Sequence, residues 1–246
     1  SIDMASTLAA ARVTNGLTNN GTINLNADSV LSFEGTNTLS GNGSIVFGNS
    51  GNNRLGVDGN GVLTIGANTT IRGQNGNIGD AVFLGGNNGL VNNGTISADV
   101  AAGTITLRSL NLGITNNGTI SALNGGTIQL QNNLVGTAGS QLVAGAGSTI
   151  LQQGVTVSGV INTSGSGSFR PTNNGSNFLN GVTLNGTLDM ASALSNERVI
   201  GNLVTRLTAE ALIQDHPEIL DERIVAPLVI VGPTRSGTTR LHRMLS

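Results

Sequence analysis

Leu90-Val-Asn-Asn-Gly-Thr-Ile96 is the stretch that decides the fold, because the chain uses it repeatedly. It recurs as Leu17-Thr-Asn-Asn-Gly-Thr-Ile23, as Ile114-Thr-Asn-Asn-Gly-Thr-Ile120 and, in weaker form, as Leu184-Asn-Gly-Thr-Leu188. The step from the glycine of the 90–96 copy to that of the 114–120 copy is 24 residues. A period of this length is typical of one coil of a solenoid. The sequence therefore predicts a repeat architecture.

The repeated unit combines a corner with a short strand. Asn-Gly dipeptides favour left-handed backbone conformations at turns, since glycine carries no Cβ and asparagine bonds its own backbone. Between the corners run alternating segments, namely Thr104-Ile-Thr-Leu107, Thr127-Ile-Gln-Leu130 and Val62-Leu-Thr-Ile65. A period of two sends their Ile and Leu side chains inward and their Thr and Gln side chains outward.

These features predict a right-handed parallel β-helix over residues 1–195. Strands this short are marginal alone, but stacked coils pair almost every backbone edge and bury a continuous aliphatic column. An antiparallel sandwich or barrel is the structural alternative, because Asn-Gly turns also form hairpins. It explains neither the 24-residue echo nor the lack of Trp and Tyr. The phenylalanines are expected to fill the core: Phe33, Phe47, Phe83, Phe169 and Phe178.

A change of composition after Ser195 predicts a second region, residues 196–246. The first 195 residues hold 5 basic and 7 acidic side chains, whereas the last 51 residues hold 6 of each. Both histidines, His216 and His242, lie in this short region. The whole chain is therefore expected to be mainly β, with a β-helix followed by a small α/β fragment.

Four elements are expected in residues 196–246. The apolar spacing predicts a helix over residues 197–215, ended by Pro217. Residues 227–231 form a continuous apolar run typical of a buried parallel strand. The glycine loop Gly232-Pro-Thr-Arg-Ser-Gly-Thr-Thr239 follows, and a helix is expected to begin at Arg240. This loop has the two glycines of a phosphate-binding loop, although Thr238 stands where the usual lysine would be.

In repeat style, residues 1–195 resemble the β-helical repeats of bacterial surface and secreted proteins, such as autotransporter passengers and filamentous-haemagglutinin-like adhesins. The resemblance implies a non-catalytic extended structure at the cell surface or outside the cell, with a glycan or protein as its target. The carboxylates Asp58 and Asp80 stand alone in the sequence. We therefore expect neither a metal site nor a catalytic set in this region.

Residues 196–246 resemble the start of a bacterial sulfotransferase that uses 3′-phosphoadenosine 5′-phosphosulfate (PAPS), on the helix, strand and loop just quoted. The resemblance implies that the loop binds the 5′-phosphosulfate and that Arg235 offsets charge on the sulfuryl group. The other loop residues implied to bind are Ser236, Gly237, Thr238 and Thr239. The reaction implied is sulfuryl transfer to an acceptor hydroxyl or amine, which would place the protein in the cytoplasm.

The chain stops before the catalytic base and 3′-phosphate site that this resemblance requires, so no turnover is expected. Ile2-Asp-Met-Ala-Ser6 also echoes Leu188-Asp-Met-Ala-Ser192 near the junction, which suggests a fusion of two coding sequences. Three hypotheses stay open: a surface β-helix, a sulfotransferase with an unusual β-helical extension, and a chimera without a joint function.

Charge and composition exclude several partners. A net charge of −2 and the absence of a lysine run give no basis for nucleic-acid binding. No stretch is long and apolar enough to span a bilayer, and Ser1-Ile-Asp-Met4 lacks the basic start and apolar run of a signal peptide. The chain has no cysteine, which excludes disulfides and thiolate metal sites. Open ends of a β-helix are expected to favour self-association.

Overall fold

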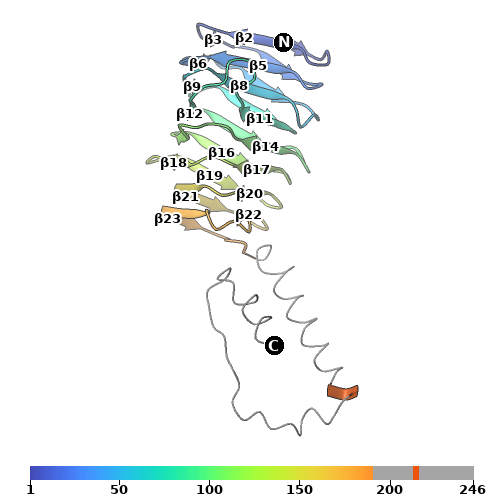
Figure 1. Ribbon diagram of the computed structural model, residues 1–246, viewed down its shortest axis with the longest axis vertical. Coiled ribbons are helices and arrows are strands. Elements are labelled where there is room, and N and C mark those ends of the chain that lie inside the picture. Colours follow the sequence, from blue (N-terminus) through green and yellow to red (C-terminus); the bar gives the residue numbers. More distant parts are fainter. Residues whose placement is uncertain (191–212, 216–246) are drawn as a thin grey trace, which may run out of the picture. The chain divides into compact units, whose positions relative to one another are not determined.

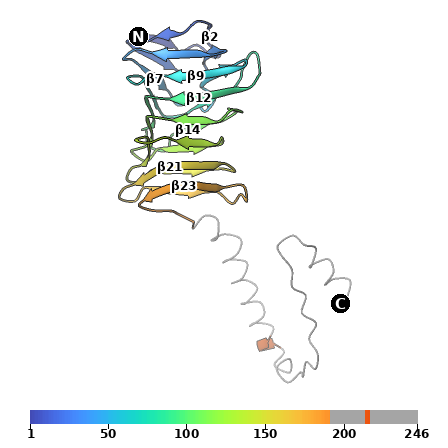
Figure 2. The ribbon, with the colours of Figure 1, turned by 90° about the vertical axis from the view of Figure 1, so that its left-hand side faces the viewer.

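The computed structural model describes residues 1–190 and 213–215. The chain divides into two compact units, Ser1–Ser195 and Asn196–Ser246. The first unit is a parallel β-solenoid of about eight turns, whose coils are stacked one upon the next (Figure 1, Figure 2). Residues 213–215, the last three of the expected helix, are helical. Residues 191–212, the expected strand at 227–231 and the helix from 240 lie outside the described residues.

Each coil contributes one strand to each of three faces. Face 1 is formed by β1 (Ile2–Met4), β4 (Thr22–Leu25), β7 (Ser44–Phe47), β10 (Thr70–Gly73), β13 (Thr95–Ala98), β16 (Thr119–Ala122) and β19 (Gln141–Ala144). Face 2 is an eight-stranded sheet of β2 (Ala10–Val13), β5 (Val30–Glu34), β8 (Arg54–Asp58), β11 (Gly76–Gly79), β14 (Thr104–Leu107), β17 (Thr127–Leu130), β20 (Thr149–Gln152) and β22 (Ser168–Pro171).

Face 3 is formed by β3 (Leu17–Thr18), β6 (Asn37–Ser40), β9 (Gly61–Ile65), β12 (Asn88–Asn92), β15 (Ile114–Asn116) and β18 (Leu134–Gly136). The longer strand β21 (Thr156–Thr163) rounds the corner between faces 3 and 1, because its start pairs with β18 and its end with β19. β23 (Phe178–Asn185) then pairs along β21. Every pairing among the described strands is parallel, so the antiparallel sandwich is wrong.

The core is a column of aliphatic side chains that repeats from coil to coil. Ile71, Ile96 and Ile120 are paired in register on face 1, and none is exposed to solvent. Burying one such side chain contributes roughly 1.5–3 kcal/mol. The same column continues in both directions through Ile23, Ile45, Leu142, Ile161 and Leu184. The three strands quoted from the sequence form as expected, with Leu107 and Leu130 inward.

The Asn-Asn-Gly corner joins face 3 to face 1. Its first asparagine points into the solenoid, where the Nδ2 atom of Asn92 donates to the Oδ1 atom of Asn116 at 2.8 Å. Its second asparagine forms an outer ladder, in which the Nδ2 atom of Asn117 donates to the Oδ1 atom of Asn93 at 2.8 Å. Side-chain amides at both positions therefore connect one coil to the next.

The expected left-handed conformation is wrong at this corner. Gly21, Gly94 and Gly118 are not among the glycines with positive φ. The corner needs glycine for space instead, since a Cβ on Gly118 would overlap the carbonyl oxygen of Gly94 in the preceding coil. At Gly21 a Cβ would meet no atom within 4 Å.

Two of the five phenylalanines do not fill the core. Phe33, Phe47 and Phe169 are buried as expected, but Phe83 is 41% exposed and Phe178 is 58% exposed. Phe83 belongs to the connection between β11 and β12, which lies outside the coil. Phe178 pairs with Thr156, one position away from the inward column, so alternation turns its side chain outward.

Two sequence likenesses prove not to be structural repeats. Leu184 pairs with Ile161 on face 1, so Leu184-Asn-Gly-Thr-Leu188 rounds the corner between faces 1 and 2 and not the Asn-Asn-Gly corner. Likewise Ile2 pairs with Ile23 on face 1, whereas Leu188 bridges to Phe169 on face 2. The two Asp-Met-Ala-Ser copies thus begin at different positions of the coil.

Candidate functional site

The residues predicted from the sequence to bind PAPS lie outside the described residues: Arg235, Ser236, Gly237, Thr238 and Thr239. The same is true of His216 and His242. The described chemistry therefore belongs to the solenoid, where polar and charged side chains gather on the outer side of face 2.

The connection between β11 and β12, residues 80–87, shapes this surface. Its last residue, Asn87, stays in the stack of coils. The amide of Gly61, the first residue of β9, donates to the carbonyl oxygen of Asn87 at 3.0 Å. Its middle turns back across the outside of face 2 toward earlier coils. There the ring of Phe83 lies 5.0 Å from the guanidinium carbon of Arg12 in β2, a cation–π contact.

Asp58, the last residue of β8, fastens this connection. Its side chain points outward from the coil yet is fully buried under residues 80–87. The amides of Phe83 and Leu84 donate to its Oδ1 atom at 2.7 and 2.8 Å, and the hydroxyl of Ser32 donates to Oδ2. A single carboxylate thus holds two consecutive amides of the returning segment.

Two opposing effects act on the pKa of Asp58. Burial raises the pKa, whereas hydrogen bonds from the Leu84 amide, the Ser32 hydroxyl and the amides of Phe83 and Val82 lower it. The hydrogen bonds prevail, and the pKa lies below its ordinary value. Asp58 is therefore a charged anchor at neutral pH and is poorly suited to proton transfer.

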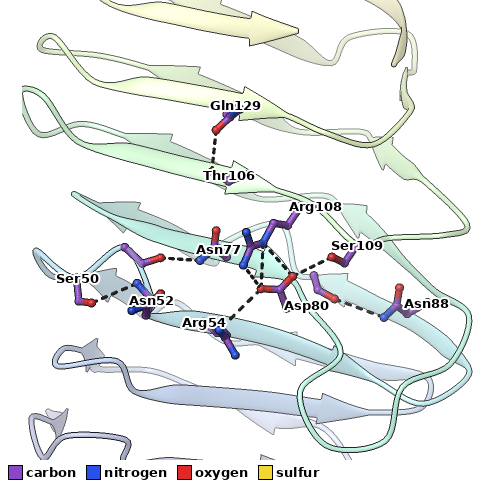
Figure 3. Close-up of polar contacts among 12 residues, drawn as sticks. Ser50, Asn52, Arg54, Asn77, Asp80, Asn88, Thr106, Arg108, Ser109 and Gln129 are labelled. Atoms are coloured by element: carbon purple, nitrogen blue, oxygen red, sulfur yellow. Dashed lines mark hydrogen bonds and ion pairs between the residues drawn. The ribbon is translucent and has the colours of Figure 1, made fainter. Parts of the chain in front are cut away.

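Asp80 sits between two arginines that come from the neighbouring coils (Figure 3). The Nε and Nη2 atoms of Arg108 donate to its two oxygens at 3.0 and 2.7 Å, and the Ser109 hydroxyl donates at 2.9 Å. On the other side the Nε atom of Arg54 lies 3.6 Å from Oδ2, without a hydrogen bond. Asp80 therefore neutralises Arg108 closely and Arg54 loosely.

A groove of about 340 Å³ lies beside the returning segment, on the outer side of the first three coils. Its apolar lining comes from Leu8, Ala10, Val30, Val82 and Phe83, and its polar lining from Asp28, Asn52 and Arg54. Grooves of roughly 300–1,000 Å³ with a few convergent polar groups are typical binding sites for small molecules. This groove is the candidate functional site of the solenoid.

A second hollow, of about 250 Å³, lies at the corner between faces 2 and 3. Its amides are already committed to the backbone. The Oδ1 and Nδ2 atoms of Asn132 bond the amide and carbonyl of Leu110, both at 3.0 Å, and the Oδ1 atom of Asn133 accepts from the amide of Thr156 at 2.9 Å. These side chains close the corner and are less available to a ligand.

Neither the groove nor the partners of Asp58 and Asp80 were predicted from the sequence. The sequence shows no other carboxylate near Asp58 or Asp80, and the partners that the structure gives them are donors: amides and a hydroxyl for Asp58, and two arginines and a hydroxyl for Asp80. One signal was present in the sequence, since Arg54 and Arg108 each lie about one coil from Asp80. Residues one coil apart become neighbours in a solenoid. Nothing comparable marked Asp58, because its partners include backbone amides.

The described residues carry few groups arranged for chemistry. Within residues 1–190, every arginine is ion-paired, namely Arg12 with Glu34, Arg54 and Arg108 with Asp80, Arg72 with Asp99 and Arg170 with Asp189. In the same part of the chain, no three His, Cys, Asp or Glu side chains gather as metal ligands would. Among the described residues there is also no helix of the length and hydropathy needed to cross a bilayer.

Comparison with protein-family models, with curated proteins and with solved structures finds no match to this chain.

Proposed function

We propose that residues 1–195 form a non-catalytic, right-handed β-helical scaffold of a bacterial surface or secreted protein, in the manner of autotransporter passengers and haemagglutinin-like adhesins. The observation that carries the proposal is the stacked solenoid itself, with an aliphatic core inside the described coils and a ligand-sized groove on the outside. The target is a surface glycan or a protein. The scaffold displays that groove away from the core.

The state of the carboxylates supports a binding role over a catalytic one. A general acid or base works best with a pKa near the working pH. Asp58 has a lowered pKa, and Asp80 faces two arginines. A polysaccharide hydrolase would need a second carboxyl group beside one kept protonated. The described carboxylates that line or border the groove are instead held by hydroxyl, amide or guanidinium donors.

Two measurements test this function. The chain is incubated with a panel of neutral and acidic polysaccharides, and reducing ends and unsaturated products are followed; we expect neither. In intact source cells, antibodies against the solenoid and added protease should reach it without lysis. Release of sugar ends, or complete protection of the solenoid in intact cells, would contradict the proposal.

For residues 196–246 we propose a PAPS-binding segment, on the strength of the glycine loop at 232–239. The test is calorimetry of the whole chain with adenosine 3′,5′-bisphosphate and with PAPS. We expect weak binding and no sulfuryl transfer. Tight binding that is lost in Arg235→Ala, together with transfer to an acceptor hydroxyl or amine, would favour the alternative, a sulfotransferase with a β-helical extension.

We further propose that copies of the chain associate through the ends of the solenoid. On the first coil Ile2 is 59% exposed and Leu8 is 70% exposed, and apolar side chains are also exposed on the last described coil. Sedimentation velocity over a range of concentrations tests this. Association should weaken in Ile2→Lys, since a charge on an edge strand opposes pairing. A monomer at every concentration would contradict it.

A further inference from the structure

The groove has an apolar wall on each side. Ala10 and Val30 occupy adjacent positions of the same outward column on β2 and β5, and Leu8 lies beside them. Val82 and Phe83 form the opposite wall from the returning segment. Such walls suit a flat body that carries carbon-bound hydrogens on its faces, and Phe83 contributes an aromatic ring to stack against it.

The polar groups of the groove are left with unused bonding capacity. Asp28 accepts one hydrogen bond, from the Ser50 hydroxyl to Oδ1. Arg54 approaches Asp80 only at 3.6 Å, through its buried Nε atom, and the side chain as a whole is 33% exposed. Asp28 and Arg54 carry opposite charges and line the same groove. No ion pair within 4 Å joins them in the described coils, so one acceptor and one donor of the groove are not used up by each other.

The charges of the groove favour a neutral ligand. Asp28 and Arg54 balance one another, and Asp80 behind Arg54 further offsets its charge. An anion would meet the carboxylate of Asp28, and a cation would meet the guanidinium group of Arg54. A neutral molecule with adjacent hydroxyl groups can donate to Asp28 and accept from Arg54, with Asn52 able to do either.

We propose that this groove binds one neutral sugar residue of a glycan. A pyranose ring places its carbon-bound hydrogens against the apolar walls, and two neighbouring hydroxyls reach Asp28 and Arg54. The inference rests on the proposed binding function of the solenoid and names the class of its ligand. The anchor at Asp58 favours binding, because a wall fixed in advance loses little conformational freedom when the ligand enters.

The probes are the methyl glycosides of glucose, galactose, mannose and N-acetylglucosamine, with methyl glucuronide as the anionic comparison. Each is titrated into the whole chain, and saturation-transfer NMR and calorimetry report binding. We expect at least one neutral glycoside to bind with a dissociation constant in the millimolar range, which is usual for a small shallow site. The glucuronide should bind more weakly than its neutral counterpart.

Two variants test whether the ligand binds in the groove. Ala10→Trp fills the groove from an exposed position on β2, and Asp28→Asn removes the charged acceptor while keeping an oxygen for Ser50. Both should weaken binding by about tenfold or more. Leu151→Trp is the matched control, since it lies in the same outward column on β20, far from the groove. It should bind as the unaltered chain does. Equal melting temperatures would show that all three variants fold.

Three outcomes would overturn the inference. The first is no binding of any neutral glycoside at about 50 mM, which excludes even weak millimolar affinity. The second is equal loss of binding in the Leu151→Trp control. The third is binding of the glucuronide alone. None of these three outcomes depends on catalysis. Release of reducing ends from polysaccharides would instead contradict the proposed non-catalytic function, without contradicting the binding of a sugar in the groove.

Discussion

The regular coils from β13 to β17 differ from the coils from β5 to β11, here called the decorated coils because residues 80–87 cover them, in how their outward polar side chains are bonded. In the regular coils, like residues bond like residues one coil apart, as Ser121 does with Ser97 at 3.0 Å. In the decorated coils, Asp58 and Asp80 bind backbone amides and arginines that have no counterpart in the repeat. Repetition stabilises the stack, and departures from repetition create a site.

The two regions differ most at the corner between faces 2 and 3. In the decorated coils this connection ranges from residues 35–36 between β5 and β6 to residues 80–87 between β11 and β12, whereas in the regular coils it comprises residues 108–113 between β14 and β15. The groove lies beside the returning segment 80–87, and the second hollow is lined at this corner by residues 110–113 and 131–133. The strands of each coil are fixed by their pairing with the coil before and the coil after, so differences in length are tolerated in the connections.

The largest effect should come from the repeated core. Ile120→Ala removes a fully buried side chain from the column on face 1 and should lower the free energy of unfolding by about 2–5 kcal/mol. Thr119→Ala, its outward neighbour, should change it by less than about 0.5 kcal/mol. Urea unfolding followed by circular dichroism measures both. Comparable losses at the two positions would mean that the column does not dominate stability.

The next largest effect on stability should come from two glycines at the same place in two copies of the Asn-Asn-Gly unit. Gly118→Ala forces a Cβ onto the backbone of the coil beneath and should cost about 1–3 kcal/mol. Gly21→Ala, at the same place in its own unit, meets open space and should cost nothing measurable. Thermal unfolding of the two variants compares them. If both are equally destabilised, the requirement is for backbone conformation and not for space.

The anchor of the decorated coils should matter less for global stability. Asp58→Ala leaves the amides of Phe83 and Leu84 without an acceptor, at a cost of roughly 1–2 kcal/mol. The matched control is Asp99→Ala, which breaks an ion pair with the half-exposed Arg72 and should cost about 0–1 kcal/mol. Hydrogen exchange should lose protection at the two amides in the first variant only. Unchanged protection there would show that Asp58 does not hold the segment.

The smallest effect is a dependence on pH. Because the folded pKa of Asp58 is lowered, its contribution to stability is complete above the unfolded value of about 3.9 and is lost as the pH falls through the folded pKa. The stability difference between the unaltered chain and Asp58→Asn should therefore be constant from about pH 5 upward and shrink below about pH 4. A stability difference that grows toward low pH would mean that folding raises the pKa of Asp58 and does not lower it.

Much of the fold was predictable because the solenoid repeats its own local rules. The alternation in Thr104-Ile-Thr-Leu107 and the echo of the Asn-Asn-Gly unit were sufficient to predict parallel stacked coils. The site was not predictable in the same way. Phe83 was expected in the core, since a composition-based interpretation does not distinguish a strand from a connection that leaves the coil.

The amino-acid sequence by itself determined the repeated strand, its inward aliphatic residues and the place of the Asn-Asn-Gly corners, because these depend on the period within one unit. Only the tertiary structure decided which atoms surround a given residue in each copy of the unit. Gly118 is required where Gly21 is not, and Asp58 is buried where the alternation alone would leave it exposed. The reason is that a neighbouring coil or a returning segment supplies the atoms that surround a residue, and these come from positions far away in the chain.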